Sequence, residues 1–129
     1  MYSTTVQNTL KLLALSVFID KRVYANEIAA FMDSTNNLDV LTDSGNTMTS
    51  AKLLEWFEAN QHDLKTQLSK TSEFKSWLHP ILDDLADHKE KYAILNRMIK
   101  ISKADGEFHK SEENLISLTA KHWDVRLAF

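Results

Sequence analysis

At 129 residues with 43% hydrophobic residues, the chain is long enough to bury one core of ordinary domain size. Its net charge is −3 and no basic cluster exceeds Lys21-Arg22, which argues against a nucleic-acid-binding surface. The absence of cysteine excludes disulfides, a thiolate nucleophile and thiolate metal ligands.

Hydrophobic periodicity predicts an all-α fold, a single domain over residues 1–129 built as a bundle of six to seven helices. The two glycines and one proline agree with this, because both residue types interrupt helices. The first helix is apolar on most of its sides and is therefore expected to be buried centrally. The first expected helix runs from Thr4 to Ile19 with Ser3 or Thr4 as cap, and the second runs from an Asn26 cap to Asp33. The third runs from Thr49 or Ser50 to about Leu68, and the fourth from a Thr71 or Ser72 cap to about Leu85. The fifth runs from the capping-box run Asp87–Glu90 to Ala104, and the sixth from Ser111 to His122.

Three irregularities are expected along this pattern. The helix that begins at Thr49 or Ser50 could break near Asn60. Pro80 lacks a backbone N–H and disfavours helical geometry at the preceding residue, which predicts a kink or a restart. Residues 34–49 are polar and predict a solvated loop with a short extended piece near Leu38–Leu41.

A hinge between the last two helices carries the most informative residues. In the run Ala104-Asp105-Gly106-Glu107-Phe108, Gly106 is expected to adopt a positive φ because it has no Cβ. A related run lies 85 residues earlier, where Asp20 corresponds to Asp105 and Glu27 to Glu112. Asn26 corresponds to Ser111 as a capping residue, and Val23 to Phe108 as an apolar anchor. The pattern therefore predicts two related helix-turn-helix halves, with the first helix of each half side by side.

The second hinge, with Glu112 after it, resembles the signature of the TerB-like (tellurite-resistance protein B) family. The resemblance covers roughly residues 5–34 and 88–122. The first hinge departs from the pattern, because Lys21 stands where glycine is usual and Ile19 where alanine is usual. The resemblance implies an all-helical bundle of two pseudo-symmetric halves. It also implies a bacterial cytoplasmic protein connected with tellurite or metal-ion stress.

Two interpretations of the hinge carboxylates stay open. In one, they accept hydrogen bonds from nearby backbone N–H groups and stabilise the turns and helix starts. In the other, Asp20, Glu27, Asp105 and Glu112 together hold a divalent cation, with calcium, magnesium and zinc as candidates. A self-sufficient EF-hand loop is excluded, because Ile101 and Lys103 would occupy its first and third ligand positions.

Other chemistry has little support in the sequence. The five histidines form no HxxH, HxxxH or HExxH pair, and no nucleophile elbow or phosphate loop is present. The acidic residues Asp83, Asp84 and Asp87 fit a solvated helix face. We therefore expect a non-enzymatic protein without a membrane span, located in the cytoplasm. The competing hypothesis is a protein–protein interaction module that docks a protein partner and binds no metal.

Overall fold

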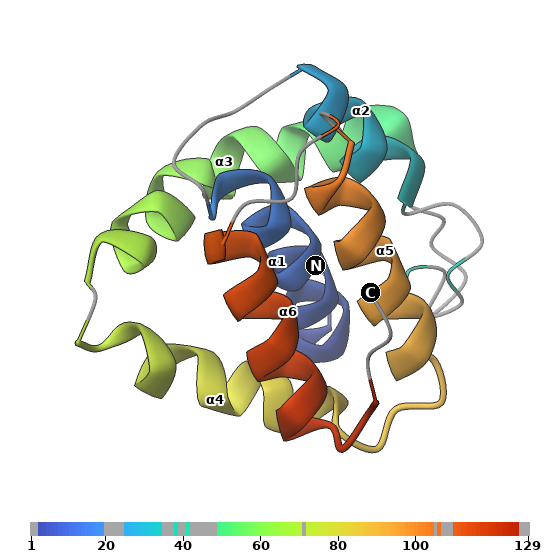
Figure 1. The fold of residues 1–129 in the computed structure, drawn as a ribbon. Coiled ribbons are helices and arrows are strands. Elements are labelled where there is room, and N and C mark those ends of the chain that lie inside the picture. The colour runs from blue at the N-terminus through green and yellow to red at the C-terminus, as the bar shows by residue number, and fades with distance from the viewer. Residues whose placement is uncertain are drawn as a thin grey trace.

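The computed structural model describes residues 3–19, 25–34, 38, 41, 49–70, 72–104, 106 and 110–126. These residues form six α-helices and no strand, which confirms the all-α prediction. None of these helices combines the length and the apolar character needed to cross a membrane. The helices are α1 (Thr4–Phe18), α2 (Ala25–Ser34), α3 (Ser50–Ser69), α4 (Phe74–Leu85), α5 (Lys91–Ser102) and α6 (Lys110–His122) (Figure 1).

α1 is the central helix of the bundle. It packs against α2, α3, α4 and α5, and Figure 1 shows it in blue, enclosed by the other helices. Its side chains are buried without interruption from Leu12 to Phe18. Ser16 is tolerated there because its hydroxyl donates to the carbonyl of Leu12 at 3.1 Å. Since burying each Leu, Val or Phe side chain contributes roughly 1.5–3 kcal/mol, α1 provides a large share of the stability of the fold.

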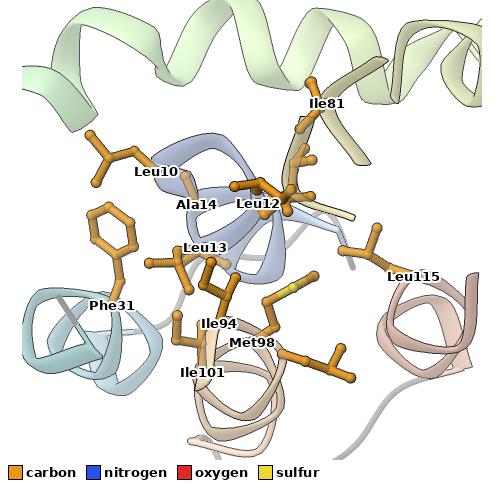
Figure 2. Close-up of a cluster of buried hydrophobic side chains, with 14 of the residues drawn as sticks. Leu10, Leu12, Leu13, Ala14, Phe31, Ile81, Ile94, Met98, Ile101 and Leu115 are labelled. Carbon is orange, nitrogen blue, oxygen red and sulfur yellow. The ribbon is translucent and has the colours of Figure 1, made fainter. Parts of the chain in front are cut away.

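The two predicted helix pairs meet through their first helices. The most extensive contact between helices in the described residues is that of α1 with α5, which confirms that they lie side by side. Figure 2 shows Ile94, Met98 and Ile101 extending from α5 into the core around α1. Phe31 of α2 and Leu115 of α6 enter the same cluster.

The second helices of the two pairs begin at equivalent points in the sequence. α2 starts at Ala25 and α6 at Lys110, which preserves the 85-residue shift of the repeat. Asn26 and Ser111 are therefore the second residues of their helices rather than the caps that the sequence predicted. In Figure 1, α2 begins at the top of the bundle and α6 begins at about mid-height on the left. Val23 and Phe108 lie outside the described residues.

Among the remaining helices, some start where the local sequence predicts and others do not. The hydroxyls of Ser3 and Thr49 accept the N–H groups of Val6 and Lys52, each at 3.2 Å. The predicted Ser3 cap is confirmed, and so is the start of α3 at Ser50, with Thr49 as its cap. The predicted Ser72 cap is wrong, because α4 begins at Phe74.

Other helix starts and helix interiors also differ from the predicted ones. The capping box at 87–90 does not form a helix start, since α5 begins at Lys91. α3 continues through Asn60, whose side-chain amide donates to the carbonyl of Trp56 at 2.8 Å. α4 continues through Pro80 without restarting.

Part of the predicted solvated loop is instead packed in the core. Leu38 and Leu41 are both buried. The N–H of Leu41 donates to the carbonyl of Leu38 at 3.0 Å, which closes a turn in place of the predicted extended piece. The other residues from 35 to 48 lie outside the described part of the chain.

Candidate functional site

The second hinge connects α5 to α6 through a glycine in the left-handed region. Gly106 has φ +86°, and its N–H donates to the carbonyl of Lys103 at 3.0 Å. This conformation suits glycine because it lacks the Cβ that disfavours positive φ. The prediction for Gly106 is confirmed, while Asp105 lies outside the described residues, as does Asp20 in the first hinge.

The glutamates that follow the two hinges are completely buried. Glu27 lies in the first turn of α2 and Glu112 in the first turn of α6, and both side chains are 0% exposed. Glu113, which follows Glu112 directly, is only partly buried and corresponds to the apolar Ile28 in the first half. Glu27 and Glu112, which the repeat relates, are therefore fully buried, whereas the adjacent Glu113 is not.

Complete burial of two carboxylates needs a compensating interaction. Removing an ionised carboxylate from water is strongly unfavourable unless it is hydrogen-bonded, paired or bound to a metal. The first turn of a helix supplies part of the compensation, because its N–H groups and the positive end of the helix dipole favour an anion. A cation held by the same oxygens would supply it as well. Both interpretations of Glu27 and Glu112 are compatible with their position.

A second group of titratable side chains brings together α4 and α6. Nε2 of His122 lies 2.6 Å from Oδ1 of Asp83, and Nδ1 of His79 lies 3.1 Å from Oδ2 of the same carboxylate. The two imidazole rings meet edge to face, with their centroids 4.8 Å apart. One ligand atom from each of the three residues lies within 4.8 Å of the other two. Among the described residues, this is the group of histidine and carboxylate side chains that has the spacing for a metal ion.

Sequence reasoning missed this group because it considered only pairs of histidines. His79 and Asp83 are four residues apart, and this spacing places two side chains on one face of a helix. That signal was present in the sequence. His122 comes from another helix, and no local pattern connects it with α4.

Comparison with known families identifies the chain. The family described as "Tellurite resistance protein TerB" matches residues 7–126. The chain belongs to the TerB family. No curated protein and no solved structure gives a significant match. TerB is not a known enzyme family.

Asp83, Asp84 and Asp87 of this TerB-family chain are exposed, as the predicted solvated face requires, and two of them also contact other helices. Asp84 lies next to the start of α1, where Nδ2 of Asn8 donates to its Oδ2 at 3.0 Å. The hydroxyl of Thr5 donates to Oδ1 at 3.5 Å. Asp83 contacts the two histidines described above, and Asp87 is exposed. Two of the three carboxylates therefore link α4 to other helices.

An open groove also lies along α6 of the TerB-family chain. It has a volume of about 520 Å³ and lies between the end of α1, the start of α4 and one face of α6. Its lining combines apolar side chains with two lysines and three uncharged polar residues: Ile19, Phe74, Leu115, Leu118, Lys75, Lys121, Ser111, Asn114 and Ser117. A groove of this size could accept apolar side chains of a partner.

Proposed function

We propose that this TerB-family chain is a non-enzymatic bacterial cytoplasmic protein of the tellurite or metal-ion stress response. In this proposal it binds a divalent cation through Asp20, Glu27, Asp105 and Glu112. The observation that carries the proposal is the complete burial of Glu27 and Glu112 at equivalent positions of the two helix pairs. The resemblance of the second hinge to the family signature supports the inclusion of Asp105, and the 85-residue repeat supports that of Asp20.

The chemistry of four carboxylates favours a hard cation. Calcium takes six to eight oxygen ligands, and magnesium takes six in a stricter octahedral arrangement. Four carboxylates would supply much of the oxygen shell of either ion, and water or carbonyl oxygens would complete it. The cation would offset the repulsion among the carboxylates and the cost of removing Glu27 and Glu112 from water.

Calorimetric titration with calcium, magnesium and zinc tests this proposal. We expect the wild-type chain to bind at least one of these cations at the hinge carboxylates, and Glu27→Gln, Asp105→Asn and Glu112→Gln to lose that binding while remaining largely helical by circular dichroism. Glu113→Gln is the matched control, since it removes an adjacent, partly buried carboxylate that has no counterpart in the first half.

Thermal unfolding gives an independent measurement of the same binding. A cation present at 100 times its Kd stabilises the folded state by about 2.7 kcal/mol, which should raise the Tm by roughly 10 °C for a chain of this size. The proposal fails if none of the three cations raises the Tm of the wild-type chain. It also fails if the Glu112→Gln and Asp105→Asn variants bind the cation as tightly as the wild-type chain.

A protein-interaction module is the second candidate function, and the groove along α6 favours it. Leu118→Glu would place a carboxylate among the apolar side chains that line this groove. We expect that substitution to abolish binding of a purified partner while the hinge variants retain it. Equal binding of the partner by the wild-type chain and by Leu118→Glu would exclude the groove as the docking site.

A further inference from the structure

We propose that His79, Asp83 and His122 form a separate binding site for zinc or another divalent first-row transition metal. The three side chains come from α4 and α6, and none of them belongs to the hinge carboxylates. Imidazole nitrogen together with carboxylate oxygen is a ligand set that suits zinc, copper, nickel and iron. The hinge carboxylates offer only oxygen, which suits calcium and magnesium better.

The distances are close to those that a bound zinc ion requires. Zinc lies about 2.0–2.2 Å from nitrogen and oxygen ligands, so ligand atoms in a tetrahedral site are about 3.3 Å apart. The three candidate ligand atoms lie within 4.8 Å of one another. Side-chain rotation can supply the remaining adjustment, because His79 and Asp83 are 63% and 55% exposed. His122 is only 18% exposed and provides the more firmly held ligand.

The backbone beneath the site is held by a buried hydrogen bond. Nε1 of Trp123 donates to the carbonyl of Leu82 at 2.8 Å, and these residues are the direct neighbours of His122 and Asp83. α6 ends at His122. Beyond it, Asp124 has φ 56°, and the N–H of Val125 donates to the carbonyl of Ala120 at 2.8 Å. The end of α6 is therefore fixed against α4, and the backbone positions of Asp83 and His122 are set before any metal binds.

Proton positions explain how the same residues act with and without a metal. In the observed arrangement, Asp83 can accept an N–H from Nδ1 of His79 and another from Nε2 of His122. To bind a cation, these nitrogens must present lone pairs, so each neutral ring carries its proton on its other nitrogen. Three protein ligands leave a coordination position for water or for a further ligand. The negative end of the α6 dipole favours a cation at this position.

The site is distant from the hinge, which allows the two proposals to be tested separately. Glu112 and His122 lie at opposite ends of α6, ten residues apart, and a helix rises about 1.5 Å per residue. Their backbones are thus separated by roughly 15 Å. Substitution of Glu112 should leave zinc binding at His122 unchanged, and substitution of His122 should leave calcium or magnesium binding at the hinge unchanged.

Zinc titration by calorimetry is the deciding experiment. We expect His79→Gln, Asp83→Asn and His122→Gln each to weaken zinc binding at least about tenfold, since even residues that only support a metal ligand contribute 10–100-fold. The controls are His62→Gln, which removes an exposed histidine of α3, and Asp87→Asn, which removes an exposed carboxylate near the same helix. Both control variants, and Glu112→Gln, should bind zinc at this site as the wild-type chain does.

NMR spectra of the histidine rings provide a second measurement that needs no substitution. Zinc should shift the ring resonances of His79 and His122 and leave those of His62 unchanged. The proposal is overturned if both histidine variants bind zinc as tightly as the wild-type chain does. It is also overturned if added zinc shifts the ring resonances of neither His79 nor His122. The three residues would then form a hydrogen-bonded contact between α4 and α6 and nothing more.

Discussion

Replacing Trp123 with Phe tests how strongly the end of α6 is attached to α4. The indole N–H of Trp123 donates to the carbonyl of Leu82 at 2.8 Å in a buried position. That carbonyl lies in the last turn of α4, where carbonyl groups have no partner within the helix. Because phenylalanine has no N–H, the substitution leaves a buried carbonyl without its donor.

The magnitude follows from two contributions. A buried polar group that loses its hydrogen-bond partner costs about 1–3 kcal/mol. The smaller phenyl ring also leaves unfilled space in the core, which adds about 1 kcal/mol. We therefore expect Trp123→Phe to lower the free energy of unfolding by about 2–4 kcal/mol.

Trp56 offers a matched control for the same change of side chain. Trp56 and Trp123 are both buried, at 6% and 2% exposure. Within the described part of the chain, Nε1 of Trp56 has no hydrogen-bond acceptor. Trp56→Phe therefore removes the same atoms without breaking a hydrogen bond, and should cost about 1 kcal/mol or less.

Urea denaturation followed by far-ultraviolet circular dichroism, with a chelator present, measures both variants. The signal should come from the helices, because both substitutions change tryptophan fluorescence directly. We expect Trp123→Phe to be less stable than Trp56→Phe by at least about 1 kcal/mol. If the two variants are equally stable, the indole hydrogen bond does not hold α6 to α4 and the reasoning is wrong.

Two further predictions concern local backbone structure. Gly106→Ala should destabilise the fold by roughly 1 kcal/mol, because the strain of a positive φ exceeds the gain from a less flexible unfolded chain. Gly106→Asn should destabilise it less, since asparagine tolerates positive φ better than alanine does. Chelator-treated samples in thermal unfolding would show the difference, and an alanine variant as stable as the wild-type chain would contradict it. Thr49→Ala should lower the free energy of unfolding by about 1 kcal/mol, because it removes the cap that accepts the N–H of Lys52. Ser72→Ala is the control: this position caps no helix, so the substitution should change stability little in the same assay.

Some features of the site were accessible to local reasoning and others were not. The positive φ of Gly106 and the relation of Glu27 to Glu112 could be read directly, because a turn and a repeat are patterns along the chain. The full burial of both glutamates could not, since the first turn of a helix is often solvent-exposed. His122 could not be connected with Asp83, because their proximity arises from the packing of α6 against α4.

The sequence by itself determined the helical fold, the central position of α1 and the caps at Ser3 and Thr49. These depend on hydrophobic periodicity and on hydrogen bonds between residues close along the chain, and both act within a single helix. Tertiary structure decided where α4 and α5 begin and why α4 continues through Pro80, since packing against other helices can outweigh a local signal. It also buried Glu27 and Glu112 and assembled the group around Asp83, because burial and proximity arise only when separate helices pack together.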